Sequence, residues 1–378
     1  MRKRLLFMPV IAFVALLTFQ PLTAQSSTLK IAWTQISHEP ATGASISPDG
    51  KQVVFGNWKT NQLTLMDWRT KKVIWQASQY FNMVGNLYWS PDGKYIAAIS
   101  GGSIHLYEAA NGDHVSKSEI YLDAYENLLG VMSGTEEMGV VYSDLKWGTN
   151  SREFAVMVHG YVLVYDLTFN KIMTVVDVTA VPPPNDVHSY LYWFDWSPDG
   201  SKFAAYHFKL DDNGVPVLPV TISMGFWDKN GRWLPQYEQS NTLEEACVPD
   251  GEDIFAGFAY PPGNDIAWGP DNKTLAVGTA QLTLCTLEDD GTLTVRKISD
   301  TGASAFHWTA NQKWLIGYIG ECSFLISDVA NNYETHSESF GEPSGEHCMG
   351  GSISWSQDDH YIALGGDDGL WVGTVEFP

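Results

Sequence analysis

Short stretches with a two-residue hydrophobic period recur along this chain, each beside a tight turn. The clearest reads WSPDGKYIAAI at residues 89–99, where Pro91, Asp92 and Gly93 form the turn. Proline presets φ, aspartate bonds to its own backbone, and glycine accepts the positive φ that other residues resist. Both alternating faces after the turn are apolar, which is typical of a β-strand packed on both sides. The stretch therefore predicts a strand, a reversal and a second strand.

Variants of this unit occur seven times. The first begins at Ser45, and the other six open with tryptophan, at Trp89, Trp147, Trp196, Trp268, Trp308 and Trp355. Successive copies are spaced by 43, 58, 49, 72, 40 and 47 residues. The shorter intervals match a four-stranded blade, so the longer ones must contain insertions. We interpret the repeated tryptophans as packing residues between neighbouring blades, with no role in ligand binding.

The two ends of the chain predict how the repeats close. The seventh unit supplies strands at 353–355, 361–365 and 370–375 and then lacks a fourth, whereas residues 29–36 form an alternating strand with no neighbour. Pairing the first strand with the last blade would remove an exposed sheet edge. We therefore expect an all-β fold, a seven-bladed β-propeller of four-stranded antiparallel blades closed by the N-terminal strand, as one domain over residues 25–378.

Residues 90–115, with SPDGKYIAAIS followed by SIHLYEAANGDHV, resemble a WD40 repeat and the related PD40-like repeats of TolB-type propellers. The resemblance covers essentially the whole chain after residue 24. It implies a propeller that serves as a platform for binding proteins or small ligands and seldom catalyses a reaction. The sequence contains no G-x-S-x-G, H-E-x-x-H or glycine-rich phosphate loop. We therefore expect no enzymatic activity, with a propeller enzyme acting on glycans or at a central metal site as the alternative.

The first 24 residues have the pattern of a secretory signal peptide. Arg2, Lys3 and Arg4 precede an apolar run over residues 5–19, and Ala24 offers a small residue for cleavage. Leu22 is large for its place before the cut, so an uncleaved anchor is the alternative. We expect an exported, periplasmic or extracellular monomer with no membrane insertion after signal cleavage, since no later segment is long and apolar enough to span a bilayer.

The chain is strongly acidic, with a formal net charge of −22. Such a surface repels nucleic acid and anionic lipid, and leaves basic protein patches, neutral sugars and cations as candidate ligands. Carboxylates in the long connections could supply the oxygens of a calcium site, but no D-x-D-x-D-G spacing occurs. We expect these carboxylates to form a solvated acidic surface, and we expect no cofactor.

The long insertions, at 122–138, 180–189, 209–223 and 239–262, fall between the second and third strands of a blade or between blades. These connections lie on the face opposite the Ser-Pro-Asp-Gly turns, and binding residues concentrate on loops held by a rigid scaffold. Aromatic residues gather there and could anchor a protein partner or cell-envelope component, or stack on carbohydrate, although they could equally pin the loops to the ring. The candidate binding residues are Trp58, Tyr80, Phe81, Tyr125, Phe208, Phe255, Phe258, Tyr260 and Phe340.

The four cysteines are even in number and widely spaced, which favours disulfides in an exported chain. Cys322 opens the third strand of the sixth unit and Cys348 lies in the connection to the seventh, so these two are predicted to pair. The remaining pair is Cys247 with Cys285.

Overall fold

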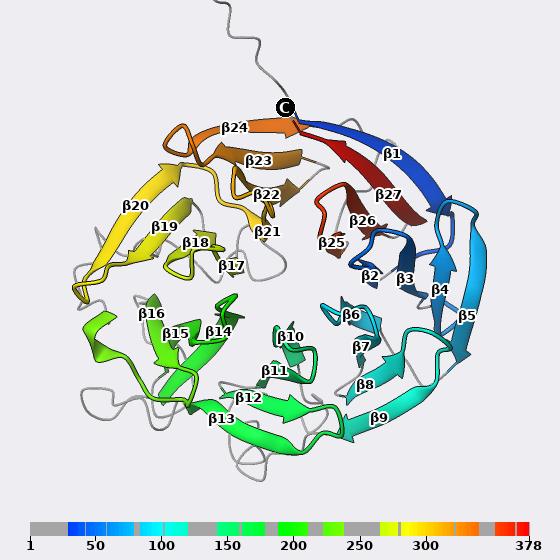
Figure 1. Ribbon diagram of the computed structural model, residues 1–378, viewed down its shortest axis with the longest axis horizontal. Coiled ribbons are helices and arrows are strands. Elements are labelled where there is room, and N and C mark those ends of the chain that lie inside the picture. The colour runs from blue at the N-terminus through cyan, green and yellow to red at the C-terminus, as the bar shows by residue number, and fades with distance from the viewer. Residues whose placement is uncertain are drawn as a thin grey trace, which may run out of the picture.

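The computed structural model confirms the seven-bladed β-propeller: seven antiparallel sheets surround a common axis, with one short 3-10 helix among the described residues (Figure 1). The structure describes residues 29–377 apart from positions 42 and 58 and the segments 79–83, 101–102, 120–141, 159–160, 178–187, 211–221, 238–264, 279–280, 321–322, 340–351 and 367–368. No helix in this part of the chain has the length and apolar character needed to cross a membrane.

Each blade is a meander that runs outward from the axis. The first blade comprises β2 (Gly43–Ile46), β3 (Gln52–Asn57), β4 (Gln62–Asp67) and β5 (Lys72–Ser78). The second and third comprise β6 (Val84–Trp89), β7 (Tyr95–Ser100), β8 (Ser103–Glu108), β9 (His114–Glu119), β10 (Tyr142–Trp147), β11 (Glu153–Val158), β12 (Tyr161–Asp166) and β13 (Lys171–Asp177). The fifth and sixth comprise β17 (Asp265–Trp268), β18 (Thr274–Gly278), β19 (Leu282–Leu287), β20 (Leu293–Ser299), β21 (Ser304–Trp308), β22 (Trp314–Gly320), β23 (Ser323–Asp328) and β24 (Glu334–Ser339).

The fourth blade departs from the expected pattern at its outer edge. It contains β14 (His188–Trp196), β15 (Lys202–Leu210) and β16 (Ile222–Asp228), and no fourth strand among the described residues. The chain turns back at Gly231 and forms only an isolated bridge between Trp227 and Trp233. Pro235 then starts the 3-10 helix η1 (Pro235–Tyr237). Because proline has no N–H to donate, it ends the pairing that would otherwise lengthen into an outer strand.

The predicted closure is confirmed in the seventh blade. This sheet has the order β1, β27, β26, β25, where β1 (Lys30–Ser37) comes from the start of the propeller and β25 (Ile353–Trp355), β26 (Tyr361–Gly366) and β27 (Gly369–Glu376) come from its end. β1 and β27 pair antiparallel from Lys30 opposite Glu376 to Ser37 opposite Leu370, with one irregularity near Ser37. The two strands lie side by side in Figure 1. We call this pairing the clasp.

The hydrophobic core lies between the blades rather than within one central mass. Each neighbouring pair of blades shares one buried cluster, such as Val54 and Leu65 of the first blade with Ile96 and Tyr107 of the second. The apolar residues on both faces of the inner strands are therefore buried, as the unbroken apolar runs of the sequence indicate.

The repeated tryptophans contribute to these interfaces, as predicted. The indole N–H of Trp89 donates to the carbonyl oxygen of Ser45 at 3.1 Å, in the preceding blade. The equivalent bonds of Trp147, Trp268 and Trp308 reach Tyr88, Asp195 and Ala267 at 3.2, 3.3 and 3.2 Å. Trp196 differs from these four, since its buried indole N–H has no partner among the described residues.

The outermost strands of the first three blades are protected by bulges. Ile74, Val115 and Ile172 each occupy the irregular position near the start of β5, β9 and β13, and each is exposed. A bulge twists an edge strand and interrupts its row of free hydrogen-bonding groups, which discourages edge-to-edge association.

Candidate functional site

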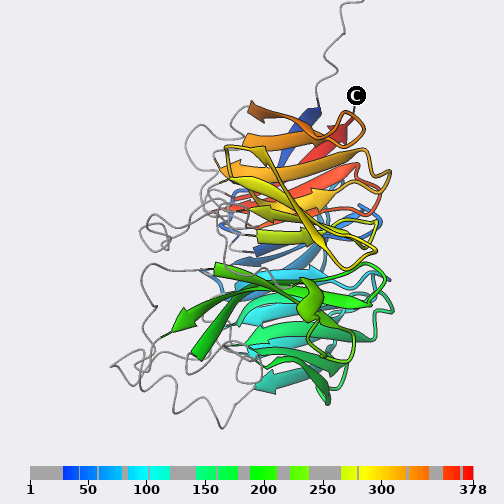
Figure 2. The ribbon, with the colours of Figure 1, turned by 90° about the vertical axis from the view of Figure 1, so that its left-hand side faces the viewer.

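The Ser-Pro-Asp-Gly turns lie together on one face of the ring, which we call the turn face; Figure 2 shows these tight turns on one side of the disc. Each turn is held by its aspartate. Asp49, Asp92, Asp199 and Asp358 accept a hydrogen bond from the serine hydroxyl two residues before, at 2.6–2.8 Å. Each also accepts the backbone N–H two residues after, at 2.9–3.1 Å. The short polar side chain thus replaces a backbone partner and fixes the reversal.

These hydrogen bonds change the acidity of the turn carboxyls. Partial burial raises the pKa of Asp49, Asp92, Asp199 and Asp358, but hydrogen bonds from the serine and the backbone, together with a nearby positive charge, outweigh burial and lower it. The turn face therefore carries a ring of carboxylates that stay ionised at neutral pH.

The lowered pKa values predict acid sensitivity. A carboxyl whose pKa is depressed in the folded state stabilises the fold above its unfolded pKa of about 3.9, and this contribution is lost as the pH falls below that value. We expect the free energy of unfolding in urea to decrease between pH 5 and pH 3. The decrease should be smaller for Asp199→Asn, because this variant lacks one titrating carboxyl. Its turn should still form, since Asn311 holds the same turn in the sixth blade with an uncharged amide oxygen. An equal decrease in both proteins would contradict this account.

Neighbouring turns are joined by the residue that follows the aspartate. Glycine fills this position in three blades, but Ser151, Asn272 and Asp359 adopt the same positive φ, at 56°, 59° and 63°. Their side chains accept backbone N–H groups of the preceding blade, from Asp92 at 3.0 Å, Asp199 at 2.8 Å and Ala310 at 2.7 Å respectively. A left-handed backbone is costly for residues other than glycine, and these bonds between blades offset the cost.

Asp359 makes a second contact between blades. Its other carboxylate oxygen lies 2.7 Å from Nε2 of His307, and the imidazole stacks on Trp355 with ring centroids 4.6 Å apart and an interplanar angle of 3°. The histidine thus serves a structural role.

The residues immediately before the repeated tryptophans lie on the innermost strands of the blades (Figure 1), and some of their side chains reach the next blade. Lys146 and Asp195 form an ion pair at 3.8 Å, and Asp195 also accepts the backbone N–H of Trp268 at 2.7 Å. Ser354 bonds to Ser45 at 3.2 Å. Each of these polar side chains makes a contact between neighbouring blades.

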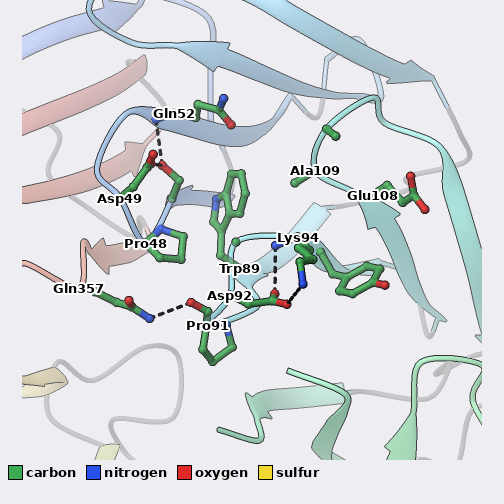
Figure 3. A pocket seen from close by; sticks show the side chains of 14 residues that line it. Pro48, Asp49, Gln52, Trp89, Pro91, Asp92, Lys94, Glu108, Ala109 and Gln357 are labelled. Carbon is green, nitrogen blue, oxygen red and sulfur yellow. Dashed lines mark hydrogen bonds and ion pairs between the residues drawn. The ribbon is translucent and has the colours of Figure 1, made fainter. Parts of the chain in front are cut away.

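A pocket of about 690 Å³ opens on the turn face between the first and second blades (Figure 3). One wall is the turn of the first blade, with Pro48, Asp49 and Gln52, and the opposite wall is the turn of the second blade. The outer wall is the connection between β8 and β9, where Glu108, Ala109 and Ala110 lie. A residue of the seventh blade completes it: the side-chain amide of Gln357 donates to the carbonyl oxygen of Pro91 at 3.0 Å.

Trp89 lines this pocket as well as bonding to the preceding blade. The sequence interpretation gave it no place in a binding site, so this is a difference. The pocket also lies on the turn face, whereas the candidate residues were sought on the insertion-bearing face.

Most of the predicted binding residues fall outside the described part of the chain. Phe208 is within β15, where it pairs with Tyr190 and Ile222. The other eight residues lie outside the described part of the chain, so the aromatic binding face stays a prediction. The residues outside the description are Trp58, Tyr80, Phe81, Tyr125, Phe255, Phe258, Tyr260 and Phe340.

Cys285 is the one cysteine within the described ranges. It is fully buried on β19 in the core between the fourth and fifth blades, and it is not a free thiol. Its partner lies outside the described residues, so the pairings Cys247 with Cys285 and Cys322 with Cys348 stay predictions. The predicted signal segment, residues 1–24, also lies outside them.

The comparison with solved structures decides the fold type. The crystal structure of the Myceliophteria thermophila Cps50 (Swd1) beta-propeller domain superposes with a TM-score of 0.62 over 92% of this chain and 100% of that chain, at 11% identity. The chain has a WD40-type β-propeller fold. No protein-family model matches the propeller.

Among curated proteins, Periodic tryptophan protein 2 of Saccharomyces cerevisiae is similar to the propeller, at 26% identity over 78 residues. The match covers 20% of this chain and only 8% of the yeast protein. The similarity is therefore one of repeat type, since it spans less than a tenth of that relative.

Proposed function

We propose that this chain is a non-catalytic, exported propeller that binds a protein or a cell-envelope component through its insertion-bearing face. The observation that carries the proposal is how the described ionisable side chains of the innermost strands are used. Lys146 is paired with Asp195, and His307 is held between Asp359 and the ring of Trp355. A hydrolytic or metal site would need such side chains to converge on the axis and to remain available for a substrate or a metal ion. Here they join blades instead, which supports a rigid scaffold.

Two further observations favour a protein partner. The fold is shared with a WD40 propeller, and rigid scaffolds with long connections concentrate binding residues on those connections. The strongly acidic composition favours a partner with a basic surface, because complementary charge speeds encounter and suppresses unsuitable partners. Export is proposed from the basic and apolar pattern of residues 1–24.

The test compares the intact chain with a variant in which residues 239–262 are shortened to a Gly-Ser linker. Both proteins are immobilised, exposed to the same envelope extract, and their captured proteins quantified by mass spectrometry. We expect at least one captured protein to decrease tenfold or more on the shortened variant, while the melting temperature stays within about 3 °C. Identical capture by both proteins would reject the insertion-bearing face as the binding surface. Fractionation of expressing cells tests export separately.

A further inference from the structure

The pocket between the first and second blades exists because two large side chains are missing from one place in the repeat. In the first blade, Gln52 pairs with Asp67, and Trp68 and Arg69 follow. In the second blade the corresponding pair is Tyr95 with Glu108, and Ala109 and Ala110 follow. The equivalent groove between the seventh and first blades is filled, whereas this one is open.

The filled groove shows what chemistry this place accepts. Trp68 packs on Tyr361 of the seventh blade with ring centroids 5.4 Å apart. The Arg69 guanidinium carbon lies over both rings, 4.4 Å from the centroid of Trp68 and 4.8 Å from that of Tyr361. Arg69 also donates to the carbonyl oxygen of Gly50 at 3.2 Å. The groove thus holds an arginine through cation–π contacts and a backbone acceptor.

The next groove round the ring is closed differently. Leu167, which follows β12, and Phe169 pack against the buried cluster between the second and third blades, as does Tyr95. Both neighbours of the open pocket are therefore filled from within the chain, one by a tryptophan and an arginine and the other by apolar side chains. Ala109 is buried in a cluster with Trp75 of the first blade. Ala110 is exposed and has neither the volume to fill the pocket nor a side-chain donor that could reach the carbonyl of Gly93, which corresponds to Gly50.

The walls of the open pocket suit the same type of occupant. Trp89, the two prolines and the two alanines give it apolar surface, and its charged side chains are three carboxylates and one lysine. Lys94 is already neutralised by Asp92 at 3.1 Å. Asp49 is likewise paired with Lys51 at 2.9 Å. A side chain with an apolar stem and a cationic head would therefore place its stem along the apolar wall and its head toward Glu108.

We propose that this pocket binds an arginine side chain from a basic segment of a partner protein, in the place that Arg69 occupies one groove away. This site lies on the turn face and does not depend on the insertion-bearing face proposed above. A failure of that proposal would leave this one standing.

The experiment titrates the whole chain with the peptide acetyl-Gly-Gly-Arg-Gly-Gly-amide, followed by NMR or calorimetry. A matched peptide carries citrulline, which keeps the shape of arginine but lacks its charge. We expect the citrulline peptide to bind at least tenfold more weakly. Absence of detectable arginine-peptide binding at 10 mM, or equal binding of the two peptides, would overturn the proposal.

Two variants locate the binding. A110R changes an exposed residue of the pocket lining. It places a guanidinium in the pocket and should weaken arginine-peptide binding at least tenfold without lowering the melting temperature. E108Q removes one exposed carboxylate of the rim without touching the core and should weaken binding several-fold. D300N removes an exposed charge from the connection between β20 and β21. The Asp300 side chain is 88% accessible, and its replacement should leave binding unchanged. Equal binding by E108Q and the original chain would reject the site. Equal loss in E108Q and D300N would show general charge attraction and would also reject it.

Discussion

Deleting residues 29–37 is expected to lower the melting temperature by about 10 °C or more and to make the protein aggregate. The deletion removes β1 and with it the buried side chains of Leu29 and Ile36, which are 3% and 7% exposed. Each buried side chain of this size contributes about 1.5–3 kcal/mol. Ile31 and Trp33 add partly buried surface against the sixth and seventh blades. The sum is a large fraction of the about 5–15 kcal/mol that holds a typical domain folded.

The deletion also leaves β27 as an unpaired edge, and exposed edges promote association between chains. Scanning calorimetry and light scattering measure both effects, and a chain lacking only residues 25–28 is the matched control.

A point variant tests the same clasp without removing any residues. Gly369 has φ of 138°, and a Cβ there would meet the carbonyl oxygen of Ser37 on β1. Gly369→Ala should cost about 2 kcal/mol or more, and unchanged melting of both variants would disprove the importance of the clasp.

Asp359→Gly is expected to lower the free energy of unfolding by about 3 kcal/mol. The carboxylate of Asp359 is buried, and its loss leaves both His307 and the backbone N–H of Ala310 without an acceptor. Glycine is otherwise the residue best suited to a φ of 63°. The expected loss therefore reports the contacts between the sixth and seventh blades and not backbone strain.

Gln312→Gly is the control for that measurement. Gln312 holds the same turn position in the sixth blade with φ of 59°, and its exposed side chain makes no hydrogen bond to any residue within the described ranges. Relief of the left-handed backbone and the greater freedom of the unfolded chain oppose each other, so the free energy should change by less than about 1 kcal/mol. Urea unfolding of both variants gives the comparison. Similar losses in the two would mean that the bonds of Asp359 contribute little.

Most of the architecture could be predicted from the sequence because short local motifs determine where each strand begins and ends. The WSPDG turns mark where strands reverse, and the unmatched strand at residues 29–36 indicates how the ring closes. The outer edge of the fourth blade could not be predicted from the repeat, since Pro235 ends a pairing that the repeat leads one to expect. A proline at that point was the available signal.

The pocket was missed for a different reason. It depends on which side chains are absent from a groove, and that becomes visible only when corresponding positions of adjacent blades are compared in space. Aligning Trp68 and Arg69 with Ala109 and Ala110 would have indicated the gap. Attention to long insertions and clustered aromatics instead favoured the opposite face, where the predicted residues other than Phe208 lie outside the described part of the chain.

Hydrogen–deuterium exchange of residues 30–37 tests the closed ring most directly, because paired amides exchange only when the sheet opens. The account predicts that amides of β1 whose N–H groups bond to β27 exchange as slowly as those of β27 itself. Exchange of the β1 amides within seconds, much faster than the amides that join β27 to β26, would contradict a ring closed by its first strand.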